Sequence, residues 1–509
     1  MQLARLAEVS RAVGATRSRN AKRDLIAELL RATPPDELEV ATAWLSGVLR
    51  QRRTGVGWRG LSTLPPPAAR SDPGLQLSDV DALLERLAAM SGPGSAAARA
   101  DAVHELFGRM TAPEQEFLRA VMTGQVRQGA LDSVMLEAVA AAADLPVALV
   151  RRAAMFSAPT GPVAVAALTG GAESLAAFTL QVGRPIRPML AGTAADVPAG
   201  VEKVGAEPLI ADTKLDGIRI QVHKDGDDVR VFTRSLDEVS DRLRGVVTAT
   251  RSLPARRLIL DGEALGIDAE GRPLAFQDTA SATAGGADVR PFFFDLLLHD
   301  VDGADVGLLD EPLSTRLTAL DSVVPPGLRT RRTVAPDAEA AAGFFARALH
   351  EGQEGVILKH PDAPYAAGRR GSAWVKVKPR KTLDLVVLAV EWGSGRRHGW
   401  LSNIHLGARD PAVPPDEPGH WVMLGKTFKG MTDDMLAWQT ERFLGLETHR
   451  EGHVVHVRPE QVVEIAFDGL QRSTRYPGGL ALRFARVLRY RDDKAAEEAD
   501  TLELVRSLA

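Results

Sequence analysis

The pattern of hydrophobic residues changes along the 509-residue chain, and this change constrains the fold more than any other feature. Up to about Val182 the sequence is rich in alanine and leucine at helical spacing, without strand-like alternation of any length. From Glu207 to about Lys381, β-branched strands separated by turns and a few helices replace this pattern. A chain of this length is too long for a single core, so we expect several domains.

After Lys381 the sequence predicts many short strands and one helix, at about Asp433–Phe443, which favours a small barrel. In the middle region long helices do not separate successive strands, so we expect an α+β domain rather than regular βαβ units. The basic, proline-punctuated segment Gly183–Pro188 is typical of a domain linker. The predicted organisation is an all-α domain over 1–182, an α+β domain over 183–382 and a β-barrel over 383–509.

Two helix starts in the first region are predicted by capping signals, Ser78 with Asp81 and Thr111 with Glu114. The segment Gly124–Gly129 lies between two predicted helices and is suited to hold backbone amides and Arg127 against a phosphate chain. That signal is weak, and a helical scaffold or dimerisation domain explains the first region equally well.

The amino-acid composition excludes several classes of chemistry. The chain contains no cysteine, which excludes disulfides, thiolate metal sites and cysteine catalysis. The net charge of -4 gives no global sign of a polyanionic partner. The N-terminus lacks the apolar core of a signal peptide and no stretch is apolar enough to span a bilayer, so we expect a cytoplasmic protein without a membrane partner.

The stretch Ala211–His223 offers a candidate nucleophile. Ile218, Ile220 and Val222 alternate with polar residues, and a turn at Asp225-Gly226 predicts a returning strand. Lys214 stands just before the first strand, beside a glycine that lets another group approach closely. A lone K-x-D-G equally fits a solvated lysine at a strand end.

Further charged groups occur in pairs. Asp261 and Glu263 are two residues apart on a predicted strand, so they share a face and suit a hard cation such as magnesium. Trp374, Lys376 and Lys378 also share a face, where both ammonium groups can converge on one anion. Singly, each of these fits a solvated strand end, as do Glu354 and Arg234. A buried core position is the ordinary expectation for Phe294, and a solvated basic face for Arg483, Arg486, Arg489, Arg491 and Lys494.

The ordered set is more specific than its parts. It runs K-L-D-G-I-R at 214–219, F-T-R at 232–234, L-D-G-E-A-L at 260–265, F-F-D-L-L at 293–297, E-G-V-I-L-K at 354–359, W-V-K-V-K-P at 374–379 and R-F-A-R-V-L-R-Y-R-D-D-K at 483–494. In order and spacing it closely resembles the ATP-dependent DNA ligases, within the covalent lysyl-nucleotidyltransferase superfamily. The resemblance is strong over the catalytic core and looser over the helical region, where 125–130 and 184–190 resemble segments of cellular ligases.

The resemblance implies a role for each matching residue. Lys214 would attack the α-phosphate of ATP to form lysyl-AMP, while Lys376 and Lys378 neutralise that phosphate. Phe294 would stack on adenine and Asp212 would accept from its amino group. The remaining implied roles are magnesium and ribose contacts for Glu263 and Glu354, nucleotide and 5′-phosphate contacts for Arg219, Arg234 and Arg370, and pyrophosphate orientation for Arg486, Arg491 and Lys494.

The resemblance also implies the substrate and the domain roles. AMP would pass to the 5′-phosphate of a nick in duplex DNA, and the 3′-hydroxyl would then displace it. The domains would be a DNA-binding domain, an adenylation domain and an OB-fold domain of a monomer, associated with the nucleoid if the protein is bacterial. Asp212 stands where the family more often has glutamate, and Ala485 where it has proline.

Other classes remain as alternatives. An RNA ligase or a capping guanylyltransferase shares K-x-D-G but rarely has such a helical region, and a DNA-binding relative with an inactive core would retain the fold. NAD-dependent ligases need zinc-binding cysteines, which this chain lacks. Gly425-Lys426-Thr427 suggests a P-loop, but the earlier glycine that the motif requires is His420.

Overall fold

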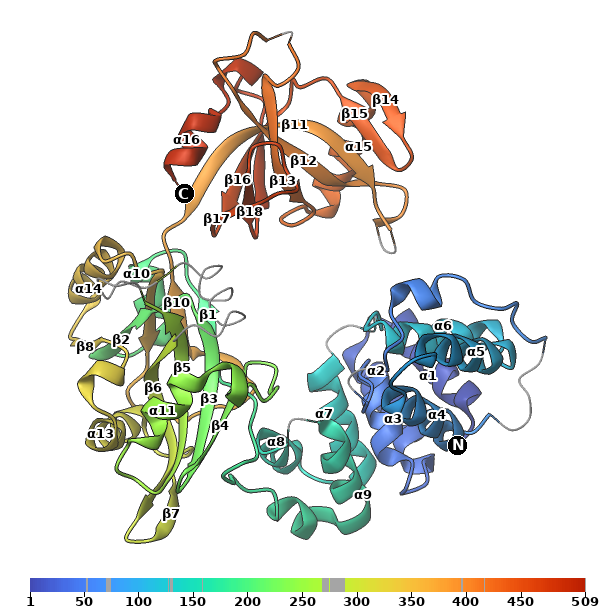
Figure 1. Ribbon diagram of the computed structural model, residues 1–509, viewed down its shortest axis with the longest axis vertical. Coiled ribbons are helices and arrows are strands. Elements are labelled where there is room, and N and C mark those ends of the chain that lie inside the picture. The colour runs from blue at the N-terminus through green and yellow to red at the C-terminus, as the bar shows by residue number, and fades with distance from the viewer. Residues whose placement is uncertain are drawn as a thin grey trace. The chain divides into compact units, whose positions relative to one another are not determined.

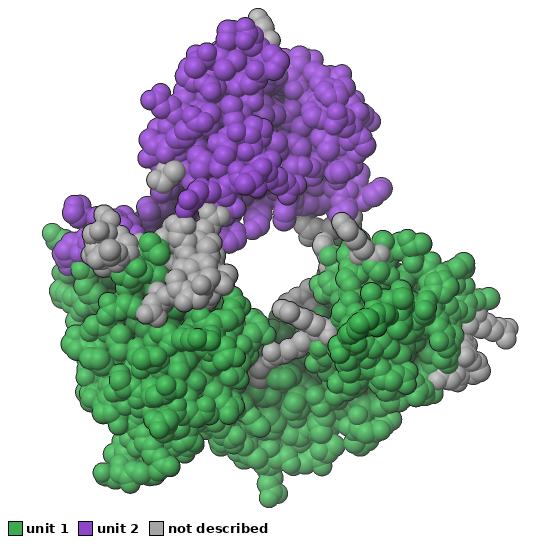
Figure 2. Space-filling model, viewed as in Figure 1, with its two compact units in different colours: residues 1–192, 201–344, 357–375 green, residues 193–200, 345–356, 376–509 purple. Residues whose placement is uncertain are grey.

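The computed structural model describes residues 1–51, 54–69, 75–126, 128, 131–157, 159–267, 274, 289–394, 397–415 and 417–508. The chain forms two compact units, which Figure 2 distinguishes by colour. The first comprises residues 1–192, 201–344 and 357–375, and the second comprises 193–200, 345–356 and 376–509. In the described part of the chain, no helix is both long and apolar enough to cross a membrane.

The N-terminal part of the first unit is helical, as predicted (Figure 1). Its helices pack around one apolar core that includes the fully buried Trp44 and Phe107. They are α1 (Leu3–Ala15), α2 (Arg19–Ala32), α3 (Leu38–Leu45), η1 (Trp58–Leu61), α4 (Leu77–Ala89), α5 (Ser95–Gly108), α6 (Ala112–Met122), α7 (Leu131–Ala143), α8 (Val147–Met155) and α9 (Thr160–Ala176).

One of the two predicted caps is confirmed. Thr111 begins α6 with a capping box, in which the Glu114 carboxylate accepts from the Thr111 backbone at 2.8 Å. The prediction for α4 is wrong, because that helix begins at Leu77 without a side-chain cap. The carboxylate of Asp81 instead accepts hydrogen bonds from Arg50 and Gln51.

Two sheets follow the helical part. The first is antiparallel, in the order β4-β3-β5-β6-β7, and the second has the order β1-β10-β9-β2-β8. Their strands are β1 (Leu190–Thr193), β2 (Leu209–Lys214), β3 (Ile218–Asp225), β4 (Asp228–Thr233), β5 (Arg257–Gly266), β6 (Val289–Val301), β7 (Ala304–Gly307), β8 (Arg332–Ala335), β9 (Gly355–Lys359) and β10 (Arg370–Val377). Helices α10 (Val197–Val204), α11 (Arg244–Arg251), α13 (Leu313–Val323) and α14 (Ala338–His350) lie between them in sequence, with η2 (Ser240–Arg242) and η3 (Pro326–Leu328). The hairpin predicted at Asp225-Gly226 is confirmed, since Asp225 pairs with Asp228 across it.

The C-terminal part of the second unit contains a seven-stranded sheet. Its order is β13-β12-β11-β15-β14, and β16 pairs with both β11 and β19. Strands β17 and β18 form a separate two-stranded sheet. The elements of this part of the chain are β11 (Lys381–Trp392), β12 (Leu401–Arg409), β13 (Trp421–Thr427), α15 (Asp433–Gly445), β14 (Glu447–Glu451), β15 (Val454–Val457), β16 (Val462–Phe467), β17 (Gly469–Arg472), β18 (Leu480–Arg483), β19 (Arg486–Arg491), η5 (Ala496–Glu498) and α16 (Leu502–Ser507). Among the described residues these pairs do not close the sheet, so the predicted barrel is not confirmed.

The predicted linker is docked rather than extended. The Gly183 N–H donates to Nδ1 of His223 at 2.9 Å, and the Ile186 N–H donates to Gln221 at 2.9 Å. Gln221 returns a bond to the Ile186 carbonyl. The segment is therefore held against side chains of β3, an interior strand of the first sheet.

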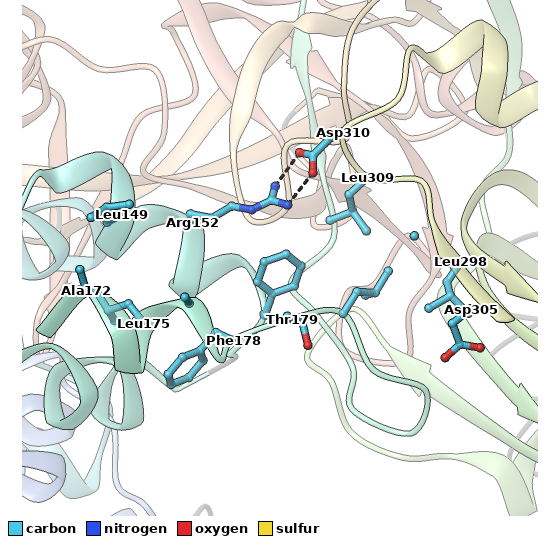
Figure 3. Close-up of a pocket in the computed structure, with 14 residues that line it drawn as sticks. Leu149, Arg152, Ala172, Leu175, Phe178, Thr179, Leu298, Asp305, Leu309 and Asp310 are labelled. Atoms are coloured by element: carbon cyan, nitrogen blue, oxygen red, sulfur yellow. Dashed lines mark hydrogen bonds and ion pairs between the residues drawn. The ribbon is translucent and has the colours of Figure 1, made fainter. Parts of the chain in front are cut away.

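A pocket of about 420 Å³ in the first unit lies between the helical part and β6 and β7 (Figure 3). At its rim, Arg152 of α8 donates two hydrogen bonds of 2.6 Å to the Asp310 carboxylate. Its lining is mainly apolar and includes Leu175, Phe178 and Leu309. None of the predicted site residues lines this pocket.

Candidate active site

Lys214 is the last residue of β2, and the strand residues before it are all buried. Its own side chain is half-buried, and Nζ donates to the Leu215 carbonyl at 3.2 Å. The buried strand therefore fixes the lysine stem while the amine lies at the strand end, where the loop to β3 begins.

Gly217 brings that loop against β5. A Cβ atom at this position would lie 2.3 Å from the Ala264 carbonyl oxygen, so no other residue fits without a shift. The Gly217 N–H donates to Oε1 of Glu263 at 3.2 Å. Burial raises the pKa of Glu263 to about 7, although the positive charges of Arg219 and Lys214 act in the opposite direction. The K-x-D-G loop and Glu263 thus form one site.

Asp261, the other carboxylate of the predicted pair, does not share this role. It is fully buried and accepts two bonds from Arg219, at 2.7 and 2.6 Å, and one from the Tyr365 hydroxyl at 2.6 Å. These partners already neutralise the Asp261 carboxylate, which leaves it less able to bind a metal ion than Glu263. Glu263 is therefore the better candidate of the predicted pair, and the cation site itself stays a prediction.

An aromatic pocket lies beside this network. Phe294 is half-buried and meets the buried Trp374 edge to face, with ring centroids 6.1 Å apart. Lys359 lies 4.8 Å from the Phe294 centroid and 4.3 Å from the Trp374 centroid. Its Nζ atom lies 2.5 Å from Oδ2 of Asp212. Sequence reasoning assigned Lys359 no role, although it ends the E-G-V-I-L-K motif.

Asp212 is almost completely buried, and burial raises its pKa against the lowering effect of Lys359. Despite the short contact with Lys359, neither of its carboxylate oxygens has a well-aligned hydrogen bond among the described residues. A buried carboxylate in this condition is suited to accept from a ligand.

The predicted arginines fall into different environments. Arg219 is tied to Asp261 and lies 4.6 Å from the Phe294 ring centroid. Arg234 is exposed just after β4, one residue beyond the pairing of Thr233 with Ile220. Arg370 is exposed at the start of β10. Arg127 lies outside the described residues.

Glu354, Lys376 and Lys378 belong to the second unit. Lys378 forms an ion pair with Glu354 and lies 3.3 Å from Asp468. Burial lowers the pKa of Lys378, but the two carboxylates outweigh it and raise the pKa overall. Lys376 is half-buried within β10, whereas Lys378 follows the end of that strand, so a face shared by the two ammonium groups stays a prediction.

The last predicted group lies on the C-terminal sheet. Arg491 and Lys494 converge on Oδ2 of Asp384, at 3.0 and 2.6 Å, and Arg491 also binds Asp493. Arg486 is exposed at the start of β19. Asp384 was not predicted, and the signal for it is a lone aspartate in an apolar strand.

Three family models match in succession: DNA ligase N terminus over residues 59–140, ATP dependent DNA ligase domain over 188–378, and ATP dependent DNA ligase C terminal region over 397–494.

Comparisons over the whole chain agree with these matches. A curated protein described as "Probable DNA ligase" from Beutenbergia cavernae is 61% identical, and the match covers 100% of both chains. A protein with the same description from a Nocardioides species is 59% identical over 99% of this chain and 98% of its own. The solved structure "Pmar-Lig_PreS3" is 19% identical and has a TM-score of 0.65 over 96% of this chain and 99% of its own, which is a likeness of fold. The chain belongs to the ATP-dependent DNA ligase family. It is an enzyme that ligates DNA and uses ATP, which sets aside the capping, RNA-ligase and inactive alternatives.

Proposed function

We propose that Lys214 is the nucleophile that receives AMP from ATP and that the protein seals nicks in duplex DNA. A bond forms between Nζ and the α-phosphorus, the α–β phosphoanhydride breaks, and pyrophosphate leaves. The 5′-phosphate of the nick then takes AMP from Lys214, and the 3′-hydroxyl displaces AMP to form the phosphodiester. The observation that carries this proposal is the position of Lys214 at the end of β2, beside Gly217 and Glu263.

Asp212, Phe294 and Lys359 would form the adenine pocket. The unsatisfied oxygens of Asp212 suit the amino group of the base, and Phe294 offers a half-buried ring for stacking. The Lys359 ammonium favours the ionised form of Asp212, because it opposes the larger effect of burial, which raises that pKa. A base without an amino donor at this position would leave the buried carboxylate with Lys359 as its one partner and without a hydrogen bond from the base, which is a basis for selecting ATP.

Magnesium fits the acidic residues of the site unequally. Glu263 offers hard oxygen ligands, and its raised pKa means that additional positive charge would favour the ionised form. Glu354 already neutralises Lys378 and would have to share its charge. When bound, the ion would polarise phosphate oxygens. Glu263 is the stronger candidate ligand and Glu354 the weaker.

The remaining predicted residues would hold phosphate groups. Arg234 and Arg370 are exposed and suited to the nucleotide and then to the 5′-phosphate of the nick, together with Lys376 and Lys378. Arg219 would act from its fixed position against Phe294. Contacts with DNA or pyrophosphate are further proposed for Arg127, Arg486, Arg491 and Lys494. To make them, Arg491 and Lys494 would have to break their ion pairs with Asp384.

We further propose that residues 1–182 bind DNA, 183–382 carry out adenylation and 383–509 form an OB-type domain of a monomeric, cytoplasmic enzyme that associates with the nucleoid. The pairing of β11 with β12, β15 and β16 supports an OB-type sheet, which is partly open in this fold. Phosphate contacts would supply much of the DNA affinity, so binding should weaken steeply with salt.

Intact-mass spectrometry tests the nucleophile. The wild type, Lys214→Ala and Lys214→Arg are incubated with magnesium and, in parallel, ATP, GTP or NAD. We expect an AMP adduct from ATP on the wild type alone, because a guanidinium keeps the charge but cannot act as the nucleophile. Both variants should still bind nicked duplex, which shows that they are folded. An adduct on either variant would contradict the assignment of Lys214, and a GMP adduct would favour capping chemistry.

A further inference from the structure

The hairpin formed by β14 and β15 carries a cluster of metal-binding side chains that the ligation chemistry does not use. It follows α15 on the C-terminal sheet (Figure 1). His449 pairs directly with His456 across the hairpin, and Glu451 is two residues beyond His449 on the same strand. These three residues therefore share one face. Val455, which points to the opposite face, is fully buried in the core, so the three side chains point away from it.

The geometry of the cluster is that of a site for a small cation. One ligand atom from each of His449, Glu451 and His456 lies within 4.8 Å of the other two. The imidazole rings are stacked, with centroids 4.3 Å apart and planes 5° from parallel. Nε2 of His456 lies 3.8 Å from the Glu451 carboxylate. Bonds to zinc of about 2.0–2.2 Å need closer ligands, and the exposed His449 and Glu451 can approach the half-buried His456 by rotating about their χ angles.

A neighbouring hydroxyl orients one of the two imidazoles. The Thr448 hydroxyl donates to the His456 carbonyl at 3.1 Å, and the same oxygen lies 3.2 Å from Nδ1 of His449. Because the hydroxyl proton is already used, its oxygen accepts from Nδ1–H. This tautomer leaves the lone pair of His449 on Nε2, free to bind a cation. Partners of this kind fix the orientation of metal-binding histidines.

The acidic group on the same face of the sheet has a different chemistry. Glu391 of β11 accepts from Asn403 at 2.6 Å and from His405 at 3.0 Å, and it pairs with Lys426. Burial opposes its ionisation, but these partners lower the pKa of Glu391 to about 2. This carboxylate is fully neutralised within the sheet. In contrast, the hairpin cluster has no lysine or arginine ion pair among the described residues at Glu451.

We propose that His449, Glu451 and His456 bind one divalent transition-metal ion of the zinc type. Two imidazole nitrogens and one carboxylate are a donor set that suits zinc, and a fourth position would be left for water. Magnesium prefers oxygen ligands and does not suit this set. The bound ion would link β14 to β15, and since β15 pairs with β11, it would hold the edge of the C-terminal sheet. Thr448 is a positioning residue for this site.

The test uses the full chain without an affinity tag, freed of metal by dialysis against a chelator. Zinc is titrated in competition with a chromogenic chelator, and cobalt is added in parallel because its visible absorption reports tetrahedral coordination. We expect one ion per chain at micromolar metal, with excess magnesium present. Hydrogen exchange of residues 447–457 should slow when zinc binds.

Five variants test which side chains bind the metal ion. His449→Ala and His456→Ala should each weaken zinc binding about 100-fold or more. Loss of a residue that only orients a ligand costs about 10- to 100-fold, and loss of the ligand itself should cost at least the upper value. Thr448→Val should weaken it about 10-fold, and Thr448→Ser should restore it. His453→Ala is the matched control, because His453 is exposed in the turn of the same hairpin and lies outside the cluster.

Three results would contradict the proposed metal site. An absence of zinc or cobalt binding at micromolar concentration would overturn the proposal. So would stoichiometric binding that survives in the His449→Ala/His456→Ala double variant, or equal loss in His453→Ala. Circular dichroism of each variant confirms that the exposed substitutions leave the fold intact. Adenylation of Lys214 is measured separately, so neither result depends on the other.

Discussion

The two carboxylates of β5 have opposite surroundings, although they are only two residues apart. Asp261 is completely buried and receives hydrogen bonds from Arg219 and Tyr365. Glu263 receives one bond from the Gly217 backbone, and burial raises its pKa to about 7. We call Asp261, which its partners neutralise, the floor of the site. We call Glu263, whose charge is not fully balanced, its rim.

The same contrast separates Asp212 from Asp261. Both are buried, but Asp212 has a single ion pair with Lys359 and no well-aligned hydrogen bond among the described residues. Protein interiors rarely leave such groups unsatisfied unless a ligand or water completes them. Asp261 therefore stabilises the fold, whereas Glu263 and Asp212 can still bind a metal ion or a nucleotide.

The largest expected effect is on the floor. Asp261→Asn would leave the half-buried Arg219 guanidinium without its fully buried anion, so we expect a loss of about 3–5 kcal/mol in the free energy of unfolding. Glu263→Gln, its counterpart at the rim, should cost about 1 kcal/mol or less. Urea denaturation followed by circular dichroism measures both. Equal losses in the two variants would remove the distinction between floor and rim.

A smaller effect should appear in the pH dependence of stability. The folded pKa of Glu263, about 7, lies above the ordinary glutamate pKa of 4.5, so the folded state binds more protons between these values. Relative to Glu263→Gln, the wild type should therefore lose up to about 3 kcal/mol of unfolding free energy as pH rises from 4.5 through 7. Parallel urea titrations of the two proteins at several pH values give this difference. A difference that is flat with pH would show that Glu263 is ionised throughout.

The smallest of the three effects is on nucleotide selection. Asp212→Asn replaces one acceptor oxygen with a donor that would face the adenine amino group, and we expect about 1–3 kcal/mol weaker ATP binding. Isothermal titration of Lys214→Ala, which cannot consume the nucleotide, measures this in the presence and absence of the second change. Asp237→Asn serves as an exposed control. Unchanged ATP affinity would place the adenine elsewhere.

Local patterns predicted much of the fold. The alternation of Ile218, Ile220 and Val222 predicts β3, and the Asp225-Gly226 turn predicts its hairpin with β4. Thr111 and Glu114 predict the start of α6. These signals succeed because the deciding interactions are between residues close in sequence. The predicted β-barrel is not confirmed among the described residues, because closure of a sheet depends on pairing between strands that are distant in sequence.

The linker illustrates the same limit. Gly183–Pro188 has the composition of a flexible connection, yet it is bonded to Gln221 and His223. Burial lowers the pKa of His223 to about 3, so the ring stays neutral and can accept from Gly183. Nothing near the linker in sequence indicates this partner.

The sequence by itself determined the family, the candidate nucleophile Lys214 and the residues that surround it, because these chemical groups occur in a fixed order that few other chains share. Only the tertiary structure decided which of them are already neutralised. Asp261 and Glu263 are equivalent in a strand pattern, but Arg219 and Tyr365 reach only the first. The availability of a charged group depends on partners brought from other strands, and periodicity carries no information about them.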